Sequence, residues 1–98
     1  MLAQLWRSVK GLPPKQRDVF VFRFHHSGRD LITILLEAEV VVWKDLAEGL
    51  ERSVADVARL WAQMPMDSAT TAIELNISRQ NVYKRRSLAI RRLKAEFT

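Results

Sequence analysis

Cysteine is absent from the 98-residue chain, and glycine and proline occur only three times each. Without cysteine the protein has no disulfide framework and no thiolate metal site, which suits a reducing compartment. Scarce glycine and proline, with no Asn-Gly or Asp-Gly pair, argue against a fold made of β-hairpins. The longest apolar runs, ITILL and VVVW, are far too short to cross a bilayer. These absences predict a soluble, cytoplasmic and mainly helical protein with no membrane contact.

Residue patterns that support catalysis or metal binding are missing as well. On a helix the adjacent His25 and His26 would point about 100° apart, so they could not share one metal as an i, i+4 pair can. Glu37 and Glu39 have no acid–base partner near them in the sequence, and neither a glycine-rich phosphate loop nor a nucleophile motif occurs. We therefore expect no enzyme activity, no cofactor and no metal site.

Charge is abundant and unevenly distributed. Residues 1–29 carry six basic and one acidic side chain, a balance of +5, whereas residues 30–75 carry three and nine, a balance of −6. Residues 76–98 carry seven and one, a balance of +6. Such segregation indicates that one face meets a polyanion while another faces solvent or protein.

Apolar residues at helical spacing predict an all-α fold with one core, since 48% of the residues are hydrophobic. We expect a first helix that ends near Gly11. Pro13 and Pro14 suit the first turn of a second helix to about His25, although its VFVF stretch also has strand propensity. Ser27 followed by Asp30 resembles a capping box that opens a third helix, and the run EVVVW after it fits an extended linker. Six aromatic residues are expected to be mostly core: Trp6, Phe20, Phe22, Phe24, Trp43 and Trp61.

From Trp43 onward the sequence repeats itself at a shift of 25 residues, from Ala47 to Ala72 and from Ser53 to Ser78. Each unit is typical of a helix-turn-helix, in which a small residue lets two helices approach and serine caps the second. Four matched positions are also compatible with coincidence, so a structural duplication is a hypothesis. The remaining matches are Leu50 with Leu75 and Val57 with Val82.

The last segment, residues 76–94, has seven basic residues and no acidic one. A helical wheel that starts from Ser78 as N-cap predicts one buried face: Val82, Ala89, Ile90 and Leu93. Leu88 points outward together with the polar and basic residues: Gln80, Asn81, Lys84, Arg85, Ser87, Arg91 and Arg92. Gln and Asn suit adenine, whereas Lys and Arg suit guanine or phosphate.

A basic helical face is often only solvated, and it can also bind an acidic protein. The preceding unit favours DNA, because it supplies Asp67 as an N-cap, Ala72 at the close-packing site and Asn76 at the turn. We therefore interpret the segment as the recognition helix of a helix-turn-helix.

The segment IELNISRQNVYKRRSLAIRRLK resembles region 4 of the sigma-70 family of RNA polymerase sigma factors. LPPKQRDVFVFRF, residues 12–24, resembles the helix that opens this region in extracytoplasmic-function members. The resemblance implies recognition of the −35 promoter element in double-stranded DNA, contact with the β flap of the RNA polymerase core, and an anti-sigma factor as a further partner. It also implies DNA contacts at five positions: Arg79, Gln80, Asn81, Tyr83 and Lys84.

The helical wheel adds three residues to this predicted DNA-binding site: Arg85, Arg91 and Arg92. Arg86 falls near the buried side of the wheel, so we expect an intramolecular partner such as Glu74.

The chain departs from the family pattern between the two matching blocks, where about forty mostly acidic residues intervene. The region that binds the −10 element is also missing, so the chain is either an excised C-terminal domain or a stand-alone relative. We predict one domain, with N-terminal helices in 1–24, a helical insertion in 25–65 and a helix-turn-helix without winged elements in 66–98. Apolar residues of the insertion are expected to pack on the helix of residues 13–24: Leu31, Ile34, Leu35, Leu46, Leu50, Val57, Leu60 and Trp61.

Two other functions remain open. A stand-alone helix-turn-helix regulator would bind an operator as a dimer, whereas the sigma interpretation predicts a monomer. A protein-interaction module would use the acidic segment or the tryptophan-bearing helices and bind DNA weakly.

Overall fold

The computed structural model describes residues 1–97, and Thr98, the last residue of the predicted helix-turn-helix segment, lies outside that description. Helices predominate within 1–97, which confirms the predicted all-α fold. None of these helices is both long enough and apolar enough to span a membrane. In chain order the helices are α1 (Leu2–Lys10), α2 (Pro14–Arg23), α3 (Leu31–Glu37), α4 (Trp43–Leu50), α5 (Val54–Trp61), α6 (Ser68–Leu75) and α7 (Arg79–Phe97).

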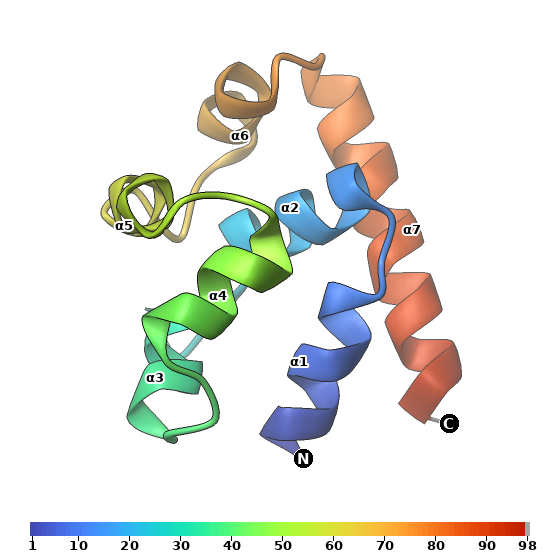
Figure 1. Cartoon of the computed structure of the whole chain (residues 1–98). Helices are drawn as coiled ribbons and strands as arrows, with labels where there is room; N and C mark the ends of the chain where they lie inside the picture. Colours follow the sequence, from blue (N-terminus) through green and yellow to red (C-terminus); the bar gives the residue numbers. More distant parts are fainter. Residues whose placement is uncertain (98) are drawn as a thin grey trace.

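Helix α2 lies at the centre of the bundle and contacts α1, α4, α6 and α7 (Figure 1). Pro14 occupies its first turn, where a missing backbone N–H costs no hydrogen bond. Val21 and Phe22 belong to the main core, whereas Val19 packs with Ala72 and Val82 in a smaller cluster. A single helix therefore supports both the body of the bundle and the pair α6–α7.

A short antiparallel hairpin between α2 and α3 was not predicted. Its strands are β1 (His25–His26) and β2 (Arg29–Asp30). Ser27 and Gly28 have φ values of 53° and 76°, as a tight two-residue turn with two positive φ angles requires. Gly28 adopts this conformation readily because it has no Cβ. α2 therefore ends at Arg23, ahead of the hairpin and before the predicted boundary.

The predicted capping residue of α3 is also wrong. Asp30 caps α3, because its carboxylate accepts a hydrogen bond from the backbone N–H of Thr33 at 2.9 Å. Ser27 is occupied by the hairpin turn instead. His25 and His26 lie exposed on a strand rather than on a helix.

The acidic segment packs against α2 largely as predicted. Six of its eight expected apolar residues are buried in the main core with Phe22, and the backbone N–H of Met66 donates to the Phe22 carbonyl at 2.8 Å. The predicted extended linker is mostly wrong, because Glu39 is in a left-handed turn, Trp43 begins α4, and Val42 is the residue with an extended backbone. The six are Leu31, Leu35, Leu46, Leu50, Val57 and Leu60.

Ile34 is only half-buried, and the expectation of a buried Trp61 is wrong. Trp61 is 36% exposed at the edge of the bundle. Its indole N–H donates to Thr33 Oγ1 at 3.0 Å, and its ring packs edge-on against Trp43 with centroids 5.3 Å apart. The indole is held at the surface because its polar N–H has a partner there.

The repeat in the sequence corresponds to a repeat in backbone geometry. α4 and α6 end at Glu51 and Asn76, which have left-handed φ values of 56° and 53°. Ser53 and Ser78 then cap α5 and α7, and each hydroxyl accepts from the backbone N–H three residues ahead at 3.1 Å. The pairs α4–α5 and α6–α7 are therefore two copies of one helix-turn-helix geometry.

Candidate nucleic-acid interface

The turn between α6 and α7 is defined by local interactions. The Asp67 carboxylate accepts from Thr70 N–H at 2.7 Å and begins α6. Asn76 tolerates the left-handed backbone that ends α6 better than most residues do. Ala72 is small enough to let α7 approach, and it packs with Val19 and Val82. The outward side of α7 is therefore held in a fixed orientation on α2 and α6.

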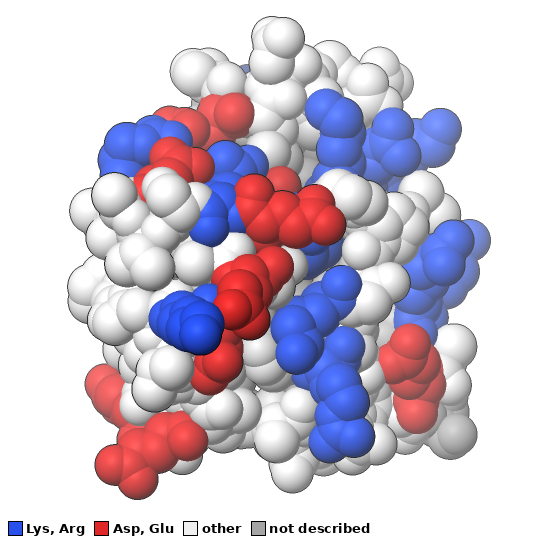
Figure 2. Space-filling model, viewed as in Figure 1, with Lys and Arg blue, Asp and Glu red and all other residues white. Residues whose placement is uncertain are grey.

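Most of the predicted DNA-binding residues lie on the surface of α7. Tyr83 is 52% exposed. The predicted buried face is confirmed for Val82, Ala89 and Leu93, and Ile90 is half-buried. Figure 2 shows Lys and Arg side chains along the side formed by α7, whereas acidic side chains gather over α4 and around α3. The other exposed members of the predicted set are Arg79, Gln80, Asn81, Lys84, Arg91 and Arg92.

Arg85 and Leu88 are less exposed than the wheel predicted. Arg85 is half-buried, and its Nε atom has no hydrogen-bond partner within residues 1–97. Leu88 is half-buried instead of pointing outward. The wheel treats α7 as packed on one side only, whereas both α1 and α2 contact it.

The expected ion pair between Arg86 and Glu74 is also wrong. Arg86 is exposed, and Glu74 accepts from Arg59 Nη1 at 3.1 Å and from Gln63 Nε2 at 3.2 Å. Arg59 of α5 bonds the Glu74 carboxylate of α6. A helical wheel of α7 alone cannot show this contact, because it contains no information about α5.

Arg23 and Ser68 lie in the predicted site, although no pattern in the sequence indicated them. The Ser68 hydroxyl lies 3.1 Å from the Tyr83 hydroxyl and 3.4 Å from Arg79 Nη2. The Arg23 guanidinium lies over the Tyr83 ring, 5.8 Å from its centroid. The hydrogen bond with Ser68 lowers the pKa of Tyr83, and Arg79 adds to this shift. We call these four residues the arginine–tyrosine cluster.

The arginine–tyrosine cluster combines two guanidinium groups and two hydroxyls from three helices, a set that suits a phosphate oxygen. The carboxylate of Asp67 lies close to Arg79 and Arg23, and the hydrogen bond from the Thr70 backbone lowers its pKa. No sequence signal could have found Arg23, because only the packing of α2 against α7 brings it to Tyr83.

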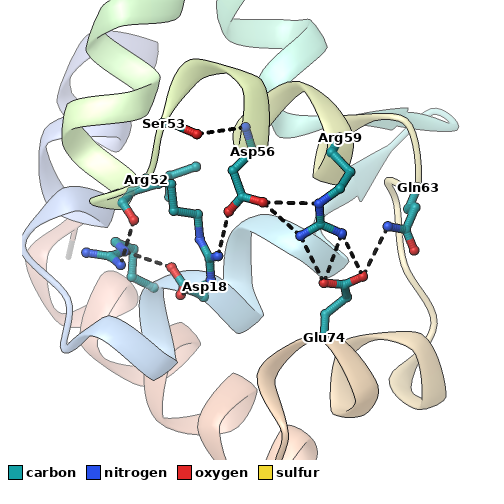
Figure 3. A network of polar contacts seen from close by, with 9 residues as sticks. Asp18, Arg52, Ser53, Asp56, Arg59, Gln63 and Glu74 are labelled. Atoms are coloured by element: carbon teal, nitrogen blue, oxygen red, sulfur yellow. Dashed lines mark hydrogen bonds and ion pairs between the residues drawn. The ribbon is translucent and has the colours of Figure 1, made fainter.

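The first helix-turn-helix unit lacks a comparable free cationic face. At the shift of 25 residues, Arg59 occupies the position of Lys84 and Asp56 that of Asn81. Arg59 bonds Asp56 at 2.8 Å and Glu74 at 3.1 Å, so its charge is neutralised within the protein. Figure 3 shows the network that results, which runs from Asp18 through Arg52, Asp56 and Arg59 to Glu74. Within residues 1–97, the second unit alone presents basic residues without ion pairs in the first turns of its second helix.

The pKa shifts in this network predict how stability depends on pH. Hydrogen bonds from Arg52 and Arg59 lower the pKa of Asp56, and those from Arg59 and Gln63 lower the pKa of Glu74. Folded pKa values below the unfolded ones stabilise the protein above about pH 4, and this contribution is lost as pH falls through the folded values. We expect the unfolding free energy of Arg59→Gln to fall less than that of the parent between about pH 5 and pH 3.

Urea unfolding at a series of pH values measures this difference. Arg7→Gln, which changes an exposed arginine on α1, is the control and should follow the parent curve. Parallel curves for the parent and Arg59→Gln would show that these ion pairs contribute no stability.

No group of three or more His, Asp or Glu side chains in residues 1–97 is placed to hold a metal ion. No protein-family model, curated protein or solved structure matches the chain.

Proposed function

We propose that the protein binds double-stranded DNA through the α6–α7 helix-turn-helix and recognises a promoter −35 element, as region 4 of a sigma-70-type factor does. The observation that carries the proposal is the exposed first part of α7. Its first turns present Arg79, Gln80, Asn81 and Lys84 on a helix whose other side is anchored on α2. These residue types bind base edges and phosphates when a recognition helix enters the major groove.

The arginine–tyrosine cluster supports the same proposal. A phosphate bound there would lie beside the start of α6, next to the exposed turns of α7. Phosphate contacts fix the orientation of a protein on the duplex, while base contacts supply specificity. Contact with the polymerase β flap and with an anti-sigma factor belongs to the proposal through the family resemblance alone.

Selection of bound duplexes from a random DNA pool tests the proposal. One short asymmetric motif is the expected result, because a single helix-turn-helix reads one half-site. A palindromic motif would indicate a dimeric regulator instead. The absence of any enriched sequence would contradict sequence-specific DNA binding altogether.

The salt dependence of DNA affinity tests the arginine–tyrosine cluster. For four to six phosphate contacts, log K should fall against log salt with a slope of about −4 to −5. We expect Arg23→Gln to make this slope shallower by about one unit and to lower the affinity for selected and random duplexes equally. We expect a similar change for Arg91→Ala and Arg92→Ala if both ends of α7 contact the backbone. Fluorescence anisotropy titrations at several salt concentrations measure the slope.

Arg7→Gln is the matched control for these variants. Arg7 lines the same shallow depression as Glu96, at the far end of α7 from Arg79. The slope of log K against log salt for Arg7→Gln should equal that of the parent. An unchanged slope for Arg23→Gln would remove the arginine–tyrosine cluster from the DNA interface while leaving the α7 contacts intact.

A further inference from the structure

An apolar surface formed by α3, α4 and α5 has no role in the proposed DNA binding. Its main feature is a groove of about 410 Å³ between the end of α3 and the start of α4. Val42 is 62% exposed there. Contiguous exposed apolar areas on a small protein commonly mark a binding site. The groove is lined by Leu36, Glu39, Val41, Val42 and Trp43.

The apolar surface continues from the groove onto α5. Trp43 packs against Trp61, which is 36% exposed. α5 also exposes Val54 and Ala58, and Ala62 follows at its C-cap; the three line up because they are spaced four residues apart. These positions correspond to Arg79, Tyr83 and Ser87 of the second unit. Figure 2 shows a largely uncharged area at its left edge, between the charged residues around α5 and the acidic residues near α3.

The charges around the groove favour a basic partner. Glu39 lines the groove, Glu37 is the last residue of α3 beside it, and Asp45 lies in the first turn of α4. Arg29 already pairs with Glu37, so Lys44 is the nearby cation left exposed without an ion pair in residues 1–97. Glu39 and Asp45 likewise form no ion pair within that range. The surplus is negative, which disfavours nucleic acid and favours lysine or arginine.

The end of α3 is locally unfavourable in the free protein. A helix C-terminus carries partial negative charge, yet α3 has no basic residue in its last turn and ends with Glu37. Glu39 adds a second carboxylate, and its φ of 58° is a left-handed conformation in which glycine is the usual residue. A cationic group bound beside these carboxylates would offset the electrostatic part of this cost.

We propose that the surface of α3, α4 and α5 binds an amphipathic helix of a partner protein, with apolar side chains in the groove and Lys or Arg on its flanks. Leu36, Val42, Trp43 and Trp61 provide the apolar contacts. Glu39, which lines the groove, faces a basic flank. This binding mode lays one helix face into a groove and needs anchors at i, i+3, i+4 and i+7. The proposal does not depend on DNA binding, because the two surfaces share no residue.

Peptide selection on the immobilised full chain tests this proposal. A displayed random library of about 16 residues gives room for four helical turns. Enriched peptides should combine apolar residues at helical spacing with Lys or Arg on both flanks. Val42→Ser changes an exposed side chain and leaves the core intact. It should lower the affinity for these peptides about fivefold or more.

A matched pair of glycine variants separates binding from stability. Glu39→Gly should raise the melting temperature by about 4 °C, because it relieves an unfavourable backbone conformation. The same variant should lower the affinity for the selected peptides. Glu51→Gly relieves the same conformation at the end of α4, where φ is 56°, and should leave peptide affinity unchanged.

Any one of four results would overturn the proposal. The first is no enrichment of amphipathic peptides, and the second is enrichment of peptides with acidic flanks. The third is equal peptide affinity for the parent, Val42→Ser and Glu39→Gly. A chain that sediments as a dimer, and that Val42→Ser converts to a monomer, would assign the surface to self-association and overturn the proposal as well.

Discussion

Asp18→Ala is expected to lower the free energy of unfolding by about 3–5 kcal/mol, because it removes one partner from a buried ionic group. The Asp18 side chain is only 8% exposed. It accepts from Arg17 Nε at 2.9 Å and from Arg52 Nη2 at 3.3 Å. Arg17 is itself buried and donates to the Leu50 carbonyl at 3.2 Å, so it cannot turn outward without breaking that bond. Alanine would leave the buried Arg17 with only the exposed Glu51 as a counter-charge.

Chemical denaturation of Asp18→Ala and of a control variant measures this cost. Glu48→Ala is the control, because Glu48 is an exposed carboxylate on α4 that should change stability by less than about 0.5 kcal/mol. A loss below about 1 kcal/mol for Asp18→Ala would mean that water or a shifted side chain replaces the lost carboxylate.

Replacing Gln80 and Lys84 together with alanine should weaken binding to the selected DNA sequence by about 2–6 kcal/mol, if each residue makes a base contact worth 1–3 kcal/mol. Both side chains are exposed and lie one helical turn apart in the first half of α7. Binding to random duplex should change little, because base contacts carry the discrimination and phosphate contacts carry the common affinity. Competition titrations with selected and random duplexes measure both quantities.

Arg59→Ala is the matched control for this double variant, because Arg59 occupies the Lys84 position of the first unit and is bound to Asp56 and Glu74. It should leave the ratio of specific to random affinity unchanged. If the double variant weakens both duplexes equally, Gln80 and Lys84 contact phosphates and other residues of α7 read the bases.

Local signals in the sequence predicted three helix caps correctly, although the predicted end of α2 and the predicted cap of α3 are wrong. Ser53, Ser78 and Asp67 cap helices where their side chains can accept backbone N–H groups, and these interactions depend on neighbours three residues away. The repeat at 25 residues was informative for the same reason. The hairpin turn at Ser27 and Gly28 was not predicted from the sequence. Asn-Gly and Asp-Gly indicate such a turn more strongly than Ser-Gly does.

Predictions that depended on tertiary contacts were less successful. Trp61 was expected in the core by its apolar neighbours, but its indole N–H bonds Thr33 at the surface. Glu74 was assigned to Arg86 from one helix alone, whereas Arg59 approaches from α5. Arg23 entered the candidate site only through the packing of α2 against α7. Helical periodicity defines which side of a helix is buried, but it does not define which neighbour covers it.

The central position of α2 means that the proposed DNA-binding unit depends on the rest of the bundle. Residues 12–24 and 66–97 look like a separable pair of blocks in the sequence, yet Phe22 is completely buried by the segment between them. Joining the two blocks directly would expose this side of α2 and would remove the hydrogen bond from Arg52 to Asp18. The intervening residues share one core with Phe22, so domain boundaries drawn from the predicted helix-turn-helix alone would cut through that core.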